Sequence, residues 1–380
     1  MTFTVPRYGE ASLSDVLPSV LGALEVGDTN PLGLAPVQRA VVMLVDGLGL
    51  MGLRRHADAA PYLTSMQCRE LTAGFPSTTV TSLASLSTGV PAGQHGLTGY
   101  STYVEEIDSA VNWLAWRPVG RNDDLRDRLV PEVVQPEPTM WQRAAASGVA
   151  VSIVSSRDYD GTGLTRAVFR GGDYRPVTTS GDAVSAAAAA VDRGHRSLVY
   201  TYIPELDFIG HVRGADSDAW IAQLSMVDRH VELLANRLPV GTMLIVIADH
   251  GMATIDPDQA VDADAEGSPL RVGVRALAGE PRMRHVHALP GAASDVLAAW
   301  RSALGEHAWV ITRDEAIDAG LFGGSVTPRA RARIGDVLAI SRGSGGVVQR
   351  KRESLLSSLI GHHGALTDEE LLVPLLSTQV

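Results

Sequence analysis

The segment Met243-Leu-Ile-Val-Ile-Ala-Asp-His-Gly251 consists of six apolar residues that end abruptly in Asp-His-Gly. A short apolar run bounded by turn residues is typical of a strand buried on both faces of a sheet. Val41-Val-Met-Leu-Val-Asp46 has the same form. So do residues 198–203, which lead into Pro-Glu-Leu-Asp, and residues 149–154, which lead into Ser-Ser-Arg-Asp. We therefore expect these four segments to be buried strands.

Helical patterns separate these apolar runs. Residues 140–146 precede a glycine stop, residues 183–191 are rich in alanine, and apolar residues recur with a helical period between 218 and 238. Strands that alternate with helices predict an α/β fold whose central sheet is mostly parallel and flanked by helices.

The segment 261–340 differs from the rest of the chain in its sequence pattern. It contains a basic run over 281–287 and a helix-like stretch over 292–304, and a glycine-rich segment follows it. We interpret it as a smaller inserted lid or substrate subdomain. Residues 1–260 and 341–380 then form the core of the protein.

The composition restricts the function. The chain has 380 residues, of which 45% are hydrophobic and 20% charged, as in a folded globular protein. It carries 43 acidic and 32 basic residues, and the formal charge of −11 argues against binding of duplex nucleic acid. Lys351 is the only lysine, and the only cysteine, Cys68, excludes a disulfide framework and a cysteine-based zinc cluster. No secretory signal and no apolar run of about 20 residues is evident, so we expect a cytoplasmic protein without a membrane partner.

Three of the predicted strand ends lead to an aspartate: Asp46, Asp207 and Asp249. Ligands of open α/β sheets bind at the carboxyl ends of the strands, and carboxylates gathered there repel one another unless a cation lies among them. A single Asp in such a place is otherwise an ordinary turn residue. The imidazoles that accompany these carboxylates are His211, His250 and the pair His362 and His363. Oxygen and nitrogen ligands without thiolate suit Zn²⁺ or Mn²⁺.

The segment Phe75-Pro-Ser-Thr-Thr-Val-Thr-Ser-Leu-Ala-Ser-Leu-Ser-Thr-Gly89 is rich in hydroxyl groups. Residues 80–87 can form a helix, and the free N–H groups at a helix N-terminus favour a bound anion. A threonine hydroxyl bound to a metal at that position would be a nucleophile aimed at phosphorus. The alternative role is that of an ordinary Ser/Thr N-cap.

These motifs occur in the order found in the alkaline phosphatase superfamily, and the chain resembles its nucleotide pyrophosphatase/phosphodiesterase (type I phosphodiesterase) branch. The motifs are Asp46-Gly-Leu-Gly, Phe75-Pro-Ser-Thr-Thr79, His95-Gly96, Asp207-x-x-x-His211, Asp249-His250-Gly251-Met252 and His363-Gly364. The resemblance spans residues 41–376 apart from the insert. It implies an alkaline-phosphatase-like α/β fold with two divalent metal ions, usually zinc.

The resemblance also implies roles for individual residues. One metal is assigned to Asp207, His211 and His363, and the other to Asp46, Asp249 and His250 together with the nucleophile. Family members place the nucleophilic threonine ten residues before the glycine of a Thr-Gly pair, which gives Thr79 here rather than Thr78. Ser82 stands where many diesterases carry an asparagine that contacts a phosphate oxygen, and its hydroxyl can donate one hydrogen bond.

The function implied by the resemblance is metal-dependent hydrolysis of phosphoesters through a covalent phospho-threonine intermediate. A phosphodiesterase or nucleotide pyrophosphatase that acts on a small phosphoester or nucleotide is favoured. The only lysine, Lys351, lies in a basic patch before the last metal motif, so no lysine is available to bind the dianion of a monoester. The alternatives are a phosphomonoesterase and a phosphonate hydrolase or phosphomutase on the same scaffold. The non-enzymatic alternative is a metal-holding protein that binds a phosphorylated ligand.

Overall fold

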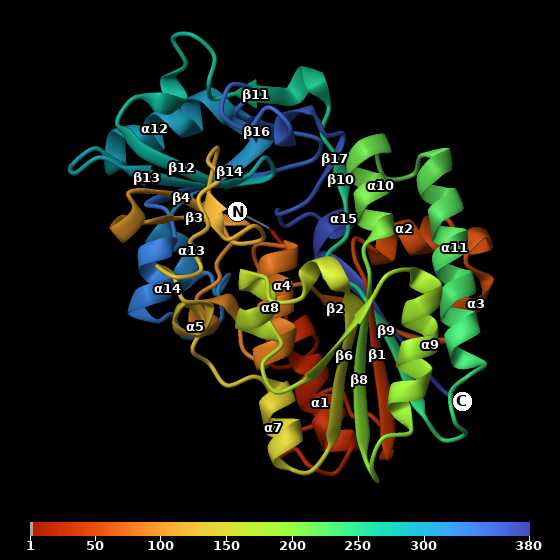
Figure 1. Ribbon diagram of the computed structural model, residues 1–380. Helices are drawn as coiled ribbons and strands as arrows, with labels where there is room; N and C mark the ends of the chain where they lie inside the picture. Colours follow the sequence, from red (N-terminus) through yellow and green to blue (C-terminus); the bar gives the residue numbers. More distant parts are fainter. Residues whose placement is uncertain (1–2) are drawn as a thin grey trace.

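The computed structural model describes residues 3–380 and places the four expected strands in one seven-stranded sheet (Figure 1). The strands are, in spatial order, β7 (Asp173–Val177), β6 (Ala150–Ser156), β8 (Ser197–Ile203), β1 (Arg39–Val45), β9 (Met243–Ile247), β18 (Leu372–Gln379) and β2 (Gln67–Thr72). Six of the strands run in the same direction, and β18, between β2 and β9, runs opposite to them. The expectation of a mostly parallel central sheet in an α/β fold is confirmed.

Helices cover both faces of this sheet (Figure 1). The layer on one face contains α2 (Leu50–Arg55), α3 (Pro61–Ser65), α9 (Ser180–Val191), α10 (Glu205–Arg213) and α11 (Asp218–Ala235). The layer on the other face contains α1 (Val16–Ala23), α4 (Thr79–Thr88), α7 (Met140–Ala146) and α8 (Gly163–Val168). The helical period read between 218 and 238 corresponds to α11, which buries Trp220, Leu224 and Val227 on one side. None of the helices within residues 3–380 is both long and apolar enough to cross a bilayer.

The segment 261–340 forms a second sheet beside the core (Figure 1). Its antiparallel strands are, in spatial order, β12 (Val274–Glu280), β13 (Met283–Ala288), β15 (Val337–Ser341) and β14 (Ala308–Thr312), with α12 (Ala293–Leu304) on one face. Alternate residues of β15 point to opposite faces, as the period of a strand requires. Val337 and Ala339 belong to a separate apolar cluster under α12, whereas Leu338 and Ile340 belong to the main core. The insert is therefore packed against the core through a shared apolar layer.

Two short strand pairs lie at the ends of the insert, and the first of them joins the insert to the core. β11 (Ala260–Asp262) pairs with β16 (Gly346–Val348), and β10 (Ala253–Thr254) pairs with β17 (Gly361–His362). A three-stranded sheet, formed by β3 (Ser101–Val104), β4 (Ser109–Asn112) and β5 (Arg117–Pro118), lies next to β12. The Ser101 hydroxyl donates to the carbonyl of Gly279 at 2.9 Å and accepts from the Gly279 N–H at 2.9 Å. The insert and the core thus share backbone-level hydrogen bonds as well as apolar contacts.

His285 is a buried polar link between the insert and the core. Its Nε2 donates to the carbonyl of Thr98 at 2.8 Å, and its Nδ1 accepts from the N–H of Gly335 at 3.2 Å. Both nitrogens are satisfied only in the neutral imidazole, which has one donor and one acceptor. Burial lowers the pKa of His285 to about 4.

We predict that His285 makes the fold sensitive to mild acid. The pKa of His285 in the folded state lies below that of a histidine in the unfolded chain, about 6.5, so the unfolded state takes up a proton that the folded state refuses. The contribution of neutral His285 to the free energy of unfolding is therefore complete above pH 6.5, and it is lost as the pH falls towards 4. In His285→Gln the loss of unfolding free energy between pH 7 and pH 5, measured by urea denaturation at fixed metal content, should shrink by about 1–2 kcal/mol. The exposed His195→Gln is the control, and an unchanged pH dependence in His285→Gln would contradict the prediction.

Candidate active site

The three aspartates singled out in the sequence converge at one edge of the central sheet. Asp46 follows β1, Asp249 follows β9, and Asp207 lies in the first turn of α10, just after β8. Because β8, β1 and β9 are adjacent and parallel, their carboxyl ends meet at the same edge. Gly47 has a φ of 72°, and a β-carbon added to it would lie 3.0 Å from Cα of Asp207. Only glycine at this position lets the loop after β1 lie so close to α10.

The first cluster of possible metal ligands consists of Asp46, Asp249 and His250. One ligand atom from each lies within 4.8 Å of the other two, and all three residues are buried. Nε2 of His250 is 3.4 Å from Oδ1 of Asp46 and 3.4 Å from Oδ2 of Asp249. The other oxygen of Asp249 accepts hydrogen bonds from the N–H groups of Gly47 and His250. Its orientation is thereby fixed by the backbone.

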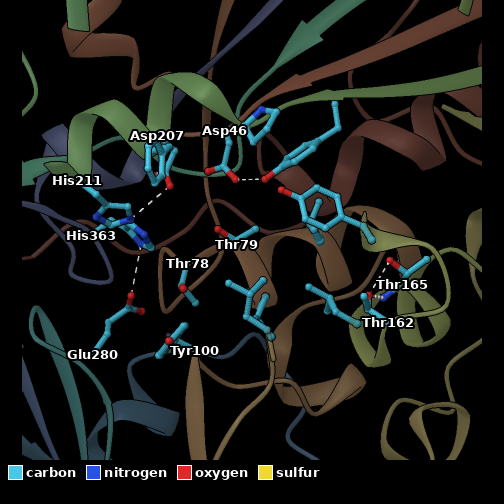
Figure 2. Close-up of a pocket in the computed structure, with 18 of the residues that line it drawn as sticks. Asp46, Thr78, Thr79, Tyr100, Thr162, Thr165, Asp207, His211, Glu280 and His363 are labelled. Carbon is cyan, nitrogen blue, oxygen red and sulfur yellow. Dashed lines mark hydrogen bonds and ion pairs between the residues drawn. The ribbon is translucent and has the colours of Figure 1, made fainter. Parts of the chain in front are cut away.

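The second cluster consists of Asp207, His211 and His363, again with ligand atoms within 4.8 Å of one another. The spacing of four residues places Asp207 and His211 on the same face of α10, with Nε2 of His211 3.3 Å from Oδ2 of Asp207. The imidazole of His363 stacks on that of His250, with ring centroids 3.6 Å apart. The two clusters are therefore neighbours, and Figure 2 shows Asp46, Asp207, His211 and His363 around one cavity.

The three histidines of the clusters share one arrangement of their ring nitrogens. Each has Nδ1 within hydrogen-bonding distance of a backbone carbonyl. The pairs are His211 with Gly361 at 2.7 Å, His250 with Gly251 at 2.9 Å and His363 with Ser77 at 3.0 Å. Since a carbonyl only accepts, Nδ1–H donates, and in the neutral imidazole the lone pair of Nε2 lies towards the cluster. This is the tautomer that a metal-ligating histidine needs.

The carboxylates of the clusters have unsatisfied oxygens. Oδ1 of Asp46, Oδ1 of Asp207 and Oδ2 of Asp249 are buried without a hydrogen-bond partner. Burial, and next the charges of Asp249 and Asp207, raise the pKa of Asp46 well above its usual range. Buried and unpaired carboxylates are costly, and divalent cations would remove both the cost and the repulsion. The donor set of carboxylate oxygens and imidazole nitrogens therefore fits two such ions.

Asp207 and His211 form an ion pair when no cation lies between them. Burial alone opposes the charge on both groups, but their mutual attraction lowers the pKa of Asp207 and raises that of His211 to about 9. A metal ligand must be deprotonated, so an ion bound to Nε2 of His211 has to displace this proton.

Thr79 begins α4 and faces the first cluster, with its Oγ1 3.2 Å from Nε2 of His250. The preceding residue, Thr78, occupies the N-cap position but makes no side-chain cap, and its hydroxyl bonds to the carboxyl of Glu280 instead. The N–H groups in the first turn of α4 are thus left for another acceptor. This arrangement differs from the ordinary N-cap that was the alternative for this segment.

The clusters and Thr79 line a cavity of about 430 Å³. Leucine and aromatic side chains form most of the wall away from the two clusters. They are Leu83, Tyr100, Leu114, Tyr159, Leu164, Phe169, Tyr200, Tyr202, Phe208, Leu355, Leu356 and Leu359. Among the lining residues, all of which the structure describes, there is no lysine or arginine. The cavity is apolar with acidic groups and imidazoles at one end.

Two polar residues of the cavity were not predicted from the sequence. Tyr202, near the end of β8, donates its hydroxyl to Oδ2 of Asp46. Glu280, the last residue of β12, has Oε2 3.5 Å from Nδ1 of His363, and burial raises its pKa to about 8. Figure 2 shows Glu280 on the side of the cavity opposite Asp46. Nothing in its local sequence marks it, because the insert brings it to the core only through tertiary packing.

The structure places Ser82, the expected phosphate contact, outside the lining of the cavity. Its side chain is fully buried, its Oγ donates to the carbonyl of Asp249 at 2.7 Å, and it is not among the residues that line the cavity. One helical turn beyond Thr79, Ser82 faces the loop after β9 rather than the cavity.

Comparison with known proteins agrees with this geometry. The sequence profile of the type I phosphodiesterase / nucleotide pyrophosphatase family matches residues 40–366. The chain belongs to this family. Membership confirms the predicted branch of the alkaline phosphatase superfamily and the prediction of an enzyme of the phosphoester hydrolase class.

Solved structures of the same fold include an inactive variant of murine ectonucleotide pyrophosphatase/phosphodiesterase 5 in complex with AMP. It is 18% identical, has a TM-score of 0.69, and the match covers 89% of this chain and 87% of that one. Phosphonoacetate hydrolase from Sinorhizobium meliloti 1021, in complex with phosphonoformate, is 18% identical with a TM-score of 0.66, and the match covers 90% of both chains. At this level of identity the likeness shows the fold.

Curated relatives match a smaller part of the chain. Phosphopentomutases of Anaeromyxobacter dehalogenans strain 2CP-C and Anaeromyxobacter sp. strain K are 29% and 28% identical over 155 residues. The match covers 40% of this chain and 36% of theirs, so the chain spans about a third of the length of these relatives.

We predict that Ser82 supports the loop of Asp249 rather than the substrate. In Ser82→Ala the buried carbonyl of Asp249 loses its donor, so the free energy of unfolding should fall by about 1–2 kcal/mol. The KM for bis(p-nitrophenyl) phosphate should stay within about twofold of that of the unmodified chain. Chemical denaturation and steady-state kinetics measure the two effects, with the exposed Ser225→Ala as control. A large rise in KM at unchanged stability would instead support a contact between Ser82 and the substrate.

Proposed function

We propose that the protein hydrolyses phosphodiesters or nucleotide pyrophosphates with Thr79 as nucleophile and two divalent metal ions, for which Zn²⁺ is the first candidate. The observation that carries the proposal is the convergence of six carboxylate and imidazole ligands beside the Thr79 hydroxyl. Asp207, His211 and His363 would hold one ion, and Asp46, Asp249 and His250 the other. When bound, the ions would lower the pKa of the hydroxyl and neutralise charge on the phosphoryl and leaving oxygens.

The chain's own groups position the reaction. Oγ1 of Thr79 forms a bond to phosphorus while the bond to the leaving oxygen breaks, and the hydroxyl proton ends on the leaving group. Water then attacks the phosphothreonine, adding its OH to phosphorus and returning its other proton to Oγ1. The N–H groups at the start of α4, which no side chain caps, would donate to the phosphoryl oxygens in both steps.

The lining of the cavity favours a diester over a monoester. A phosphodiester carries one negative charge, whereas a monoester carries up to two and is commonly bound by Lys or Arg. The cavity offers neither, and the only residue of the insert that lines it is Glu280, on the side opposite Asp46. Its apolar wall suits an uncharged aromatic or aliphatic substituent of the diester. Glu280 also supports the interpretation of the segment 261–340 as a substrate subdomain.

The proposal predicts different effects for two adjacent threonines. Thr79→Ala should reduce kcat on bis(p-nitrophenyl) phosphate at least about 1,000-fold, since the nucleophile itself is removed. Thr78→Ala should retain far more activity, because its hydroxyl bonds to Glu280 and lies outside the metal clusters. Both rates are measured at equal metal content. Full turnover by Thr79→Ala would refute the mechanism, and faster cleavage of p-nitrophenyl phosphate or phosphonoacetate would reassign the substrate.

The proposal also predicts the metal content. The purified chain should bind two zinc or manganese ions, as measured by atomic emission after removal of loosely held metal. Asp207→Asn should lower the content towards one ion per chain, because the second cluster loses its only carboxylate. Asp216→Asn, an exposed aspartate near α10, is the matched control. Two ions per chain in Asp207→Asn would contradict the assignment, and stoichiometric metal without turnover on any phosphoester would favour a binding protein.

A further inference from the structure

A basic surface adjoins the mouth of the active-site cavity. Tyr100, Leu355 and Leu356 line the cavity and also line a neighbouring hollow of about 330 Å³. Arg117, Arg121 and Arg352 also line this hollow. The positive charge that is missing from the cavity wall is therefore found just beyond its rim.

A second hollow continues the first. It has a volume of about 620 Å³, and Val119, Gly120 and Arg352 line both hollows. We call the two together the basic groove. Its cationic side chains are Arg117, Arg121, Arg271, Arg275, Lys351 and Arg352. The groove contains the only lysine of the chain.

The groove has more positive than negative charge, although the whole chain carries −11. Its only acidic lining residues are Asp108 and Glu353, and Glu353 is 2.8 Å from the buried guanidinium of Arg284. Burial, and next the charge of Arg352, lower the pKa of Arg271. Lys351 forms no ion pair within the described part of the chain. Arg352 and Arg271 share the buried carboxylate of Asp264, Arg275 pairs with Asp108, and Arg121 lies 3.9 Å from Asp123. Arg117, like Lys351, has no carboxylate partner in the described part of the chain, so its guanidinium is available to an anion at this surface.

A continuous set of side chains leads from the cavity to the first arginine of the groove. The amide of Asn112 donates to the hydroxyl of Tyr100 at 2.6 Å. Asn112 pairs with Arg117 across β4 and β5, so their β-carbons lie about 5 Å apart. Arg117 in turn donates to Oδ1 of Asn122 at 2.6 Å, which holds its guanidinium at the groove. A substituent that leaves the cavity past Tyr100 meets this guanidinium next.

We propose that the basic groove binds a second anionic group, a phosphate or carboxylate, at the far end of a substrate whose phosphodiester is held at Thr79. The inference rests on the proposed function and assigns it a substrate class: a phosphodiester with an uncharged middle and a charged distal end. The middle fills the apolar cavity, and the distal anion is bound by Arg117 and Arg121 with Arg352 beside them. The planar guanidinium suits both acceptors, because each can receive two parallel hydrogen bonds.

The test uses p-nitrophenyl alkyl phosphates whose alkyl arms of 4, 8 or 12 carbons end in either a methyl group or a phosphonate. In the unmodified chain we expect the phosphonate to raise kcat/KM at least about tenfold for one arm length or more, and 0.5 M NaCl to weaken this gain. In Arg117→Gln/Arg121→Gln the ratio between the two arms should fall to about one. Both arginines are exposed, so the fold should survive, and thermal unfolding checks this. Arg143→Gln, on α7 at the opposite end of the molecule (Figure 1), should keep the full ratio.

Each other outcome has a definite meaning. Equal rates for the two arms at every length, or a gain that survives in the double variant, would overturn the proposal. Acceleration of the methyl-arm substrate by free butylphosphonate, without any preference between arms, would assign the groove to a free anion and also overturn it. Failure to hydrolyse any of these substrates would count against the proposed function alone. Calorimetric titration of the same compounds into Thr79→Ala separates the two, because a tighter Kd for the phosphonate arm, lost in the arginine double variant, supports the groove without turnover.

Discussion

Three buried carboxylates, Asp46, Asp207 and Asp249, lie together at one edge of the sheet, and the surrounding structure depends on how their charge is compensated. In a low-dielectric interior such charges repel strongly, and each of them has one oxygen without a hydrogen bond. The protein does not supply a lysine or arginine to this cavity. It supplies imidazoles whose Nε2 atoms face the carboxylates, and divalent cations between these groups would compensate the charge. The same cations would then make an acidic protein attractive to a phosphate.

The ligands that follow the parallel strands could be predicted because short local segments of the sequence identify them. Each buried run ends where its strand ends, and adjacent parallel strands bring those ends together whatever the distance along the chain. Asp46, Asp249 and His250 follow this rule, and the i, i+4 spacing on α10 adds Asp207 and His211. His363 has no such local signal. It reaches the site because β17 and β18 return the C-terminal segment to the sheet, and its assignment came from the order of motifs in a family.

What the sequence did not predict comes from side-chain orientation and non-local pairing. β18 contains Pro374 and runs antiparallel between β9 and β2, so its place in the sheet depends on partners far away in the sequence. The basic run at 281–287 contains Arg282 and Arg284, which are fully buried. Their charges are matched by Glu370 and Glu353, which lie about 70 to 90 residues away along the chain. Spacing patterns do not reveal such pairs.

The pair Arg282 and Glu370 joins the insert to the loops that carry the candidate ligands. Both side chains are completely buried, with Nη2 of Arg282 2.6 Å from Oε2 of Glu370. The side-chain carboxylate of Glu370 also accepts a hydrogen bond from the N–H of Ala365, two residues after His363. The backbone carbonyl of Glu370 accepts one from the N–H of Gly251, next to His250. Removing one partner of a buried pair leaves an uncompensated charge, at a cost of about 3–5 kcal/mol. The turn between β12 and β13 is thus bound to the loops of both histidines, so moving the insert away would disturb the ligands on which the site depends.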